Sequence, residues 1–321
     1  MIQPYYEEAG IVIFNADCRE ALAHLKENSV HCCVTSPPYF GLRDYGNEVQ
    51  IGLEKTPEAY VGELVNVFRE VRRVLRDDGT LWLNLGDSYA GSGKGRNADG
   101  SHQEGGKQGT NTGTVIGSLV KTLAPDCKPK DLIGIPWRVA FALQADGWYL
   151  RQDIIWHKPN PMPESVRDRC TKAHEYIFLL SKSARYSFDS KAIAEPETMR
   201  PQQRLTPRKA NPNAKVHGMP VYRQAEGGTG GGMRNRRSVW TVATQPYSGA
   251  HFATFPPELI KPCIQAGCPS GGVVLDPFAG SGTTLQVARA SGCDGIGIEL
   301  NSEYCQLIKK RLRQGVLPLA A

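Results

Sequence analysis

The feature that most constrains the fold lies near the C-terminus, where a glycine-rich turn separates two short apolar runs. Gly272–Leu275 predicts a buried strand, and Asp276-Pro277-Phe278-Ala279-Gly280-Ser281-Gly282-Thr283-Thr284 follows it directly. A helix is expected over Thr283–Ala290, and then a second strand over Gly295–Ile298 that ends at an acid, Glu299. A strand, a glycine turn, a helix and an acid-ended strand form the opening of a nucleotide-binding βαβ unit.

The residues of this unit predict which nucleotide it binds. Gly280 and Gly282 permit a tight turn and a close approach of the backbone to a ligand. Glu299 stands 19 residues after Gly280, where an acid can accept hydrogen bonds from both hydroxyls of a ribose. Thr284 and Leu285 follow Gly282, so the turn is not a dinucleotide Gly-x-Gly-x-x-Gly, and it lacks the Lys-Ser or Lys-Thr of a P-loop. The ribose of an adenosine-containing cofactor is one that Glu299 can bind in this way.

A second motif, Ser36-Pro37-Pro38-Tyr39, follows the apolar run Val30–Val34. The exocyclic amine of a nucleobase is a poor nucleophile, because its lone pair is delocalised into the ring. Acceptors that bind its two hydrogens favour the pyramidal geometry that frees this pair. Ser36 offers a hydroxyl, the Pro37 carbonyl is held rigidly by the following proline, and Tyr39 offers a face for an extruded base. Taken alone, the motif more often marks a proline-rich turn; the cofactor motif downstream favours the chemical interpretation.

Together the two motifs resemble those of the S-adenosylmethionine-dependent DNA amino-methyltransferases, which methylate cytosine at N4 or adenine at N6. The resemblance covers about residues 10–190 and 238–313. The catalytic motif precedes the cofactor motif, as in the β class of that family, and a serine at the first motif position is typical of its N4-cytosine branch. The resemblance implies that the catalytic residues are Ser36, Pro37, Pro38 and Tyr39.

The resemblance also implies S-adenosyl-L-methionine as the cofactor. The expected cofactor-binding residues are Asp17, His251, Phe252, Ala253, Thr254, Asp276, Pro277, Phe278, Ala279, Gly280, Ser281, Gly282, Thr283 and Glu299. Asp17 follows a strand expected at Ile11–Phe14, where the family has an acid near the adenine. A plain helix N-cap explains Asp17 equally well.

Strands that alternate with helices predict an α/β fold with a doubly wound, mostly parallel sheet of the Rossmann-like methyltransferase type. Further strands are expected at Thr80–Leu85, Trp148–Trp156 and Glu175–Leu180, and further helices at Cys18–Lys26, Thr56–Arg76, Pro136–Ala145 and Pro257–Ala266. Residues 1–190 are expected to form the catalytic half, with a mobile glycine-rich loop at 88–118. Residues 191–237 are expected to form an irregular target-recognition insertion, and residues 238–321 the cofactor-binding half.

The insertion is strongly basic. Between Arg200 and Arg237 there are nine Lys or Arg residues and one acid, Glu226, so this stretch has a net charge of +8, whereas the whole chain has +6. A solvated basic loop is the usual explanation of such a stretch. Between the halves of a DNA enzyme it predicts phosphate contacts and some contacts to guanine edges. The expected DNA-binding residues are Arg200, Arg204, Arg208, Lys209, Lys215, Arg223, Arg234, Arg236 and Arg237.

Other features of the 321-residue chain exclude other classes. No apolar run approaches the ~18 residues that span a membrane, and the N-terminus lacks the blocks of a signal peptide. The nine cysteines are scattered without a Cys-x-x-Cys pair, and His174-Glu175 lacks the second histidine of a zinc motif because Phe178 stands there. No metal and no membrane partner are expected. The expected location is the cytoplasm of a bacterial or phage-infected cell, at the nucleoid.

The sequence thus predicts a site-specific enzyme that flips a cytosine out of duplex DNA and methylates its N4 directly. A cognate restriction endonuclease acting separately and a monomeric or homodimeric state are further expectations. An N6-adenine methyltransferase on the same scaffold is the nearest alternative. Methylation of RNA or of a protein glutamine is a second, although such enzymes usually place the cofactor motif first. A non-catalytic DNA-binding protein is the third.

Overall fold

The computed structural model describes residues 2–42, 47, 49–90, 127–197, 232–245 and 255–314. The chain divides into two compact units, one made of Met1–Asp189 with Arg237–Ala321 and the other of Ser190–Arg236. In the second unit, β7 (Glu195–Pro196) pairs antiparallel with β8 (Met233–Arg234). Most of the glycine-rich loop expected at 88–118 lies outside the described residues. Among the helices of the described part, none is long and apolar enough to cross a membrane.

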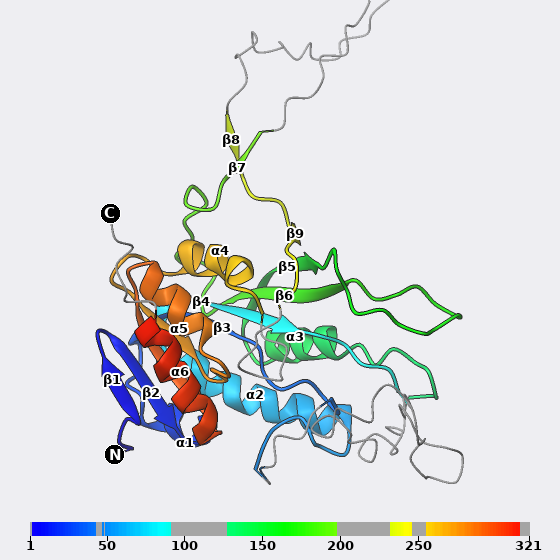
Figure 1. Ribbon diagram of the computed structural model, residues 1–321, viewed down its shortest axis with the longest axis horizontal. Coiled ribbons are helices and arrows are strands. Elements are labelled where there is room, and N and C mark those ends of the chain that lie inside the picture. The colour runs from blue at the N-terminus through cyan, green and yellow to red at the C-terminus, as the bar shows by residue number, and fades with distance from the viewer. Residues whose placement is uncertain are drawn as a thin grey trace, which may run out of the picture. The chain divides into compact units, whose positions relative to one another are not determined.

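The first unit is built on a nine-stranded sheet with the order β1-β2-β11-β10-β3-β4-β6-β5-β9 (Figure 1). Five neighbouring strands, β2, β11, β10, β3 and β4, run parallel, and β1 and the β5–β6 hairpin add antiparallel pairs. The bounds are β1 Tyr6–Glu8, β2 Ile11–Asn15, β3 Val30–Thr35, β4 Leu75–Leu85, β5 Tyr149–His157, β6 His174–Ser181, β9 Val239–Thr241, β10 Val273–Asp276 and β11 Asp294–Glu299. The doubly wound, mostly parallel sheet predicted from the sequence is confirmed.

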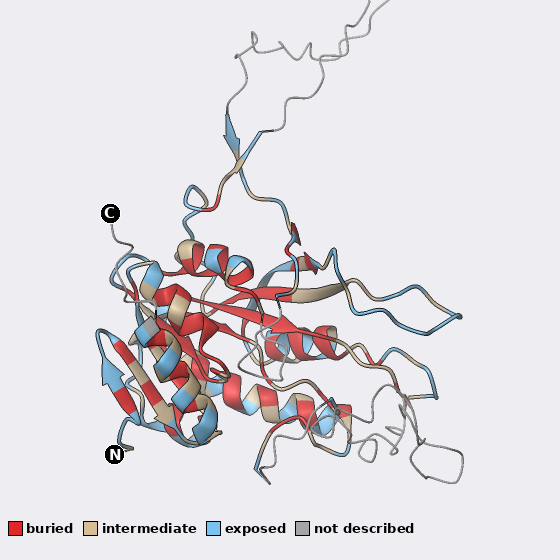
Figure 2. Ribbon diagram, in the orientation of Figure 1, coloured by how far each residue is buried: buried red, intermediate tan, exposed pale blue. Residues whose placement is uncertain are grey.

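Helices cover both faces of this sheet. One face is covered by α1 (Cys18–His24), α2 (Pro57–Val74) and α3 (Ile135–Ala145), and the other by α4 (Pro257–Gly267), α5 (Thr283–Ala290) and α6 (Ser302–Gln314). Burial on both faces explains why the central strands are almost continuously apolar rather than alternating. In Figure 2 the central strands are accordingly buried along most of their length.

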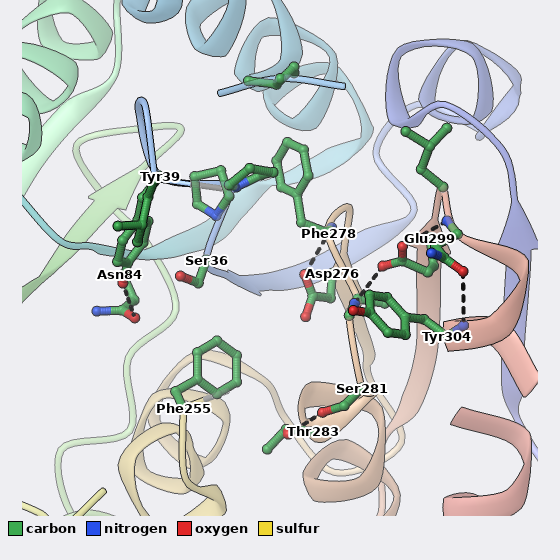
Figure 3. A pocket seen from close by; sticks show the side chains of 18 of the residues that line it. Ser36, Tyr39, Asn84, Phe255, Asp276, Phe278, Ser281, Thr283, Glu299 and Tyr304 are labelled. Atoms are coloured by element: carbon green, nitrogen blue, oxygen red, sulfur yellow. Dashed lines mark hydrogen bonds between the residues drawn. The ribbon is translucent and has the colours of Figure 1, made fainter. Parts of the chain in front are cut away.

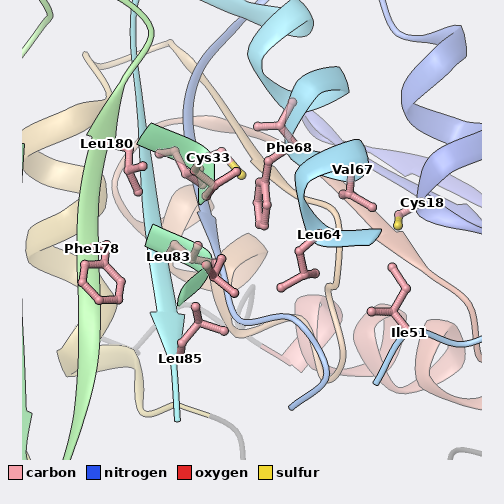
Figure 4. Packing of buried hydrophobic residues seen from close by; sticks show 14 of the residues in the cluster. Cys18, Cys33, Ile51, Leu64, Val67, Phe68, Leu83, Leu85, Phe178 and Leu180 are labelled. Atoms are coloured by element: carbon pink, nitrogen blue, oxygen red, sulfur yellow. The ribbon is translucent and has the colours of Figure 1, made fainter. Parts of the chain in front are cut away.

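Helix α2 illustrates why these segments become helices. The Thr56 hydroxyl caps its N-terminus by accepting a hydrogen bond from Ala59 N at 3.1 Å, and Pro57 occupies the first turn. Leu64, Val67 and Phe68, at helical spacing, are fully buried against the sheet (Figure 4). Burial of each such side chain stabilises the fold by about 1.5–3 kcal/mol.

The expected boundary between α2 and the next strand was wrong by a few residues. The helix ends at Val74 rather than Arg76, and Asp77-Asp78-Gly79, which lie between the expected helix and the strand expected from Thr80, belong to β4. The reason is sheet pairing: Leu75 already pairs with Val30 of β3, and the register shifts before the next pair. The extra residues therefore form a bulge in the strand rather than a loop.

Strands β3 and β10 are parallel neighbours at the centre of the sheet. From β10 the chain continues through α5 to β11 on one side, and from β3 through α2 to β4 on the other. The strand order thus reverses between β3 and β10. Ligands of open α/β sheets bind outside the carboxyl ends of the strands at such a switch point.

Candidate active site

The two sequence motifs meet at this switch point. The Thr35 hydroxyl, one residue before Ser36, donates a hydrogen bond of 2.6 Å to Asp276 Oδ1. Thr284 Oγ1 donates to the other oxygen of the same carboxylate at 2.6 Å, and Phe278 N donates to Oδ1 at 3.1 Å. Burial raises the pKa of Asp276 to about 6 although these three donors favour its charged form. Asp276 therefore ties the end of β3 to the start of the glycine turn.

The two glycines of the turn have different surroundings. Both have positive φ, +52° at Gly280 and +78° at Gly282. A Cβ added at Gly282 would lie 2.7 Å from Ile308 of α6, so this glycine permits helix packing. At Gly280 an added Cβ would meet only the Phe278 carbonyl oxygen, at 3.9 Å, so the backbone there is bare. Arg311 of α6 supports the turn by donating hydrogen bonds to side chains that follow Gly280, Ser281 Oγ at 3.1 Å and Thr283 Oγ1 at 2.9 Å.

Glu299, at the end of β11, faces the glycine turn. Its Oε2 accepts a hydrogen bond from Gly280 N at 2.7 Å, and its Oε1 accepts one from Asn301 N at 2.9 Å. Burial is the main cause that raises its pKa, to about 7, against the opposing effect of these two donors. A carboxylate offers about four acceptor positions, so two remain for a ligand.

Tyr39 is held by a polar network from the β5–β6 hairpin. Its phenol hydroxyl donates a hydrogen bond to Glu175 Oε2 at 2.8 Å. Asn84 Nδ2 also donates to Glu175 Oε2, at 3.3 Å. The Lys158 ammonium forms an ion pair with Glu175 and lies 4.2 Å from the centre of the Trp156 ring. Burial, followed by the neighbouring Glu175 charge, raises the pKa of Tyr39 well above its usual value. The phenol is therefore a neutral donor near pH 7.

Backbone contacts fix the rest of the Ser36-Pro37-Pro38-Tyr39 motif. The Tyr60 hydroxyl donates to the Pro38 carbonyl at 2.8 Å. The ring of Tyr39 packs on Gly86, where an added Cβ would come within 2.5 Å of a ring carbon. Ser36 is half-buried, and it lies between Tyr39 on one side and Asp276 and Phe278 on the other (Figure 3).

Asp17 is the N-cap of α1. Its Oδ1 accepts a hydrogen bond from Arg19 N at 2.8 Å, and its Oδ2 lies 2.6 Å from Arg19 Nη2. Burial raises the pKa of Asp17, but the hydrogen bonds from Arg19 outweigh it and leave the pKa below its usual value. Asp17 also lines a large cavity, so capping does not exclude a contact to a ligand.

One continuous cavity of about 1240 Å³ joins the two motifs. The predicted residues that line it are Asp17, Ser36, Pro37, Pro38, Tyr39, Asp276, Pro277, Phe278, Ala279, Gly280, Ser281, Thr283 and Glu299. Gly282 is not among them because it faces α6. The predicted residues His251, Phe252, Ala253 and Thr254 lie outside the described residues, although both flanks of their segment, Gln245 and Phe255, line the cavity.

The predicted DNA-binding residues are described only in part. Arg200, Arg204, Arg208, Lys209, Lys215 and Arg223 lie outside the described residues. Arg234 Nε pairs with Glu195 Oε1 at 3.0 Å, so part of its charge is already compensated within the second unit.

Sequence reasoning missed the roles of Glu175 and Asn84, and it placed Lys158 near the target base only through the resemblance of Trp156-His157-Lys158-Pro159 to a family segment. Glu175 had been considered only as half of a zinc motif, and within the described residues there is no cluster of His, Cys, Asp or Glu that could hold a metal. The available signal was weak: Asn84 interrupts the apolar run of β4, and Glu175 directly precedes the apolar run of β6. The antiparallel pairing of those two strands is what brings them to Tyr39.

Comparison with known proteins agrees with this geometry. The N6/N4 methyltransferase family model, described as DNA methylase, matches residues 30–310. The chain therefore belongs to the DNA methylase family, and it is a DNA methyltransferase.

Among its relatives are the Type II methyltransferases M.XycI of Xanthomonas campestris pv. cyanopsidis and M.SmaI of Serratia marcescens. Each is 47% identical to this chain. The match covers 95% of this chain and 88% of M.XycI, and 94% of this chain and 90% of M.SmaI.

Solved structures have the same fold. The PvuII DNA methyltransferase (cytosine-N4-specific) aligns with a TM-score of 0.64 at 17% identity, covering 99% of this chain and 90% of that one. A putative DNA modification methylase of Thermus thermophilus, TTHA0409, complexed with S-adenosyl-L-methionine, aligns with a TM-score of 0.56 at 26% identity, covering 96% of each chain.

S-adenosyl-L-methionine is the cofactor of this family, and the cavity fits it. Glu299 keeps two acceptor positions for ribose hydroxyls, and the bare backbone of Gly280 permits close approach. Phe278, Leu300 and Tyr304 line the cavity beside Glu299 and offer apolar surface to an adenine. The volume exceeds the roughly 300–1,000 Å³ of usual small-molecule sites, so a nucleobase can enter beside the cofactor.

Proposed function

We propose that the protein methylates the exocyclic N4 of a cytosine flipped out of duplex DNA. The observation that carries the proposal is the single cavity lined by both Ser36-Pro37-Pro38-Tyr39 and the glycine turn, with the Thr35–Asp276 hydrogen bond between them. The cavity would thereby hold an amine acceptor and a methyl donor side by side. The serine at the first motif position favours cytosine over adenine, because that residue type is typical of the N4 branch.

In this proposal the protein acts by positioning. Bound S-adenosyl-L-methionine supplies an electrophilic methyl group on a sulfonium sulfur. Ser36 Oγ and the Pro37 carbonyl would accept hydrogen bonds from the two amine N–H groups and orient the nitrogen, which loses one of these protons to solvent when it gains the methyl group. Near-attack placement of this kind is worth up to about 7–11 kcal/mol of the barrier.

Tyr39 stacks the extruded base, a contact worth on the order of 1–3 kcal/mol. The Glu175 carboxylate fixes the direction of the Tyr39 phenol, and the Lys158 ammonium neutralises the charge of that carboxylate. Because the cavity supplies oriented acceptors next to the methyl donor, no covalent enzyme–base intermediate is needed.

The proposal extends to the partners. The basic insertion at 191–237 holds the DNA backbone and selects the target sequence, in keeping with its net positive charge. The Type II names of the relatives support a role as the modification enzyme beside a restriction endonuclease that acts separately on the same sequence.

The decisive experiment is methylation-sensitive sequencing of DNA from cells that express the protein, followed by mass spectrometry of the nucleosides. N4-methylcytosine at one short sequence is expected. N6-methyladenine would support the alternative on the same scaffold, and unmodified DNA would contradict the proposal. A Ser36→Ala variant expressed in parallel controls for methylation by the host.

A further inference from the structure

The rim of the cavity carries an apolar side chain that the proposed chemistry does not use. Met162 is 87% exposed, yet it lines the cavity together with its neighbours Pro161 and Pro163. It lies on the segment that joins β5 to β6. Lys158, directly after β5, and Glu175, at the start of β6, belong to the network around Tyr39. Single exposed apolar residues are ordinary on protein surfaces. Met162 differs from them in the way it is held.

The segment around Met162 is fixed on both sides. Two residues before it, Asn160 exchanges two hydrogen bonds with the Thr244 backbone, at 2.9 and 3.1 Å. Two residues after it, Glu164 pairs with Arg169 at 2.6 Å. The flanking prolines further restrict the backbone. Restricting the backbone that carries an exposed apolar side chain lowers the entropy cost of placing that side chain in a partner.

The charges around Met162 suit a nucleic acid. Residues 158–172 contain four basic residues, Lys172 among them, and two acidic residues. Both acids are paired, Glu164 with Arg169 and Asp168 with Lys130 at 2.8 Å. Arg167 is exposed and forms no ion pair with the described part of the chain, so its charge is available to a phosphate.

We propose that Met162 enters the base stack of duplex DNA at the position that the flipped base leaves. The inference rests on the proposed function, because only an enzyme that extrudes a base leaves such a gap. Apolar wedges, methionine and proline among them, hold unstacked base steps open in other DNA-binding proteins. The thioether is flexible and makes favourable contacts with aromatic faces. Its place at the rim of the cavity that receives the base puts the wedge where the gap opens.

The test measures single-turnover methylation on two short duplexes that contain the mapped recognition sequence. In one the target base is paired, and in the other it is mismatched, which lowers the cost of extrusion. Met162→Ala should methylate the paired duplex about tenfold or more slowly than wild type does. On the mismatched duplex its rate should lie within about twofold of the wild-type rate. Met162→Leu, which keeps the volume, should stay near wild type on both. Val166→Ala is the matched control, because Val166 is 38% exposed on the same segment but does not line the cavity.

Two outcomes would overturn the wedge. Wild-type rates of Met162→Ala on both duplexes would show that the side chain has no part in extrusion. An equal loss on both would assign it to binding or folding, which the affinity for S-adenosyl-L-homocysteine monitors separately. If the methylated base is adenine, the cytosine proposal fails, whereas the comparison of paired and mismatched duplexes still decides the role of Met162.

Discussion

Asp276 and Glu299 are buried acids at the ends of neighbouring strands, and their partners give them different tasks. Asp276 accepts hydrogen bonds from Thr35, Phe278 and Thr284, all groups of the protein itself. It is therefore a structural link between the two motifs. Glu299 accepts only backbone N–H groups, which leaves acceptor positions for a ligand. A carboxylate with spare acceptors at the edge of a cavity is the expected place for a ribose.

Ser36 provides the most direct test at the residue scale. Ser36→Ala removes the hydroxyl acceptor and should lower kcat by roughly 10²-fold, a loss typical for one oriented hydrogen-bonding group at a reacting atom. The affinity for S-adenosyl-L-homocysteine, measured by calorimetry, should change by less than about twofold. Ser29→Ala is a suitable control, because the Ser29 hydroxyl donates to the Lys26 carbonyl outside the cavity. Equal losses of kcat and cofactor affinity would contradict the assigned role.

Glu299 predicts a pH dependence of cofactor binding. Its pKa in the free protein is raised to about 7, and ribose hydroxyls favour the charged carboxylate that accepts their hydrogens. Binding therefore releases a proton, and the affinity should rise with pH up to about 7 and level off above it. Below the pKa of Glu299, the affinity can change by at most about tenfold per pH unit.

The measurement is the Kd of S-adenosyl-L-homocysteine between about pH 6.5 and about pH 8, a range chosen because Asp276 titrates lower, near 6. Glu299→Gln should bind about tenfold or more weakly and lose the pH step. A pH step that persists unchanged in Glu299→Gln would assign the proton to another group.

At the scale of the element, the C-terminal end of strand β4 helps to position the catalytic motif, and Gly86 directly follows that strand. An alanine there would bring its Cβ to 2.5 Å from the Tyr39 ring, so the ring must move. Gly86→Ala should lower kcat by about tenfold or more and destabilise the fold by about 1–3 kcal/mol. Gly62→Ala is the matched control, since no atom lies within 4 Å of a Cβ at that position of α2. It should keep full activity and gain about 0.5–1 kcal/mol in helix stability by thermal unfolding. Full activity of Gly86→Ala would contradict the packing argument.

Much of the element pattern could be predicted from the sequence, because local signals govern it. Helix α5 has the predicted bounds, Thr283–Ala290, since a glycine turn starts it and apolar spacing sustains it. Strand β1 and the pairing of β9 beside β5 were not predicted. Those strands are 3 residues each and depend on a neighbour rather than on their own pattern.

The candidate site could be predicted to the extent that motifs encode it. Ser36 and Glu299 were named from the sequence, and both line the cavity. The contact between Tyr39 and Glu175 joins residues 136 positions apart. No local pattern reports such a partner; strand pairing across the sheet creates it.

The whole molecule explains why the order of the motifs along the chain does not matter for the site. Thr35 and Asp276 lie 241 positions apart, yet β3 and β10 are adjacent parallel strands. Their carboxyl ends therefore meet at the switch point whichever strand comes first in the sequence. The basic insertion lies between β3 and β10 in the chain. The sequence predicts the charge of this insertion but not its fold.

The charge of the insertion predicts how DNA binding depends on salt. Each phosphate contact adds about 0.9 to the slope of log K against log salt. Replacing Arg200, Arg204 and Arg208 by Gln should therefore weaken DNA binding and reduce that slope by up to about 3, without changing the affinity for S-adenosyl-L-homocysteine. The matched control replaces three ion-paired arginines elsewhere, Arg69, Arg76 and Arg138, which bind Asp146, Asp78 and Glu58. Both variants lose the same net charge. The slope is measured by filter-binding titrations. A change in the first variant alone would show that the insertion holds DNA. Equal changes in both variants would show that only the overall charge of the protein matters.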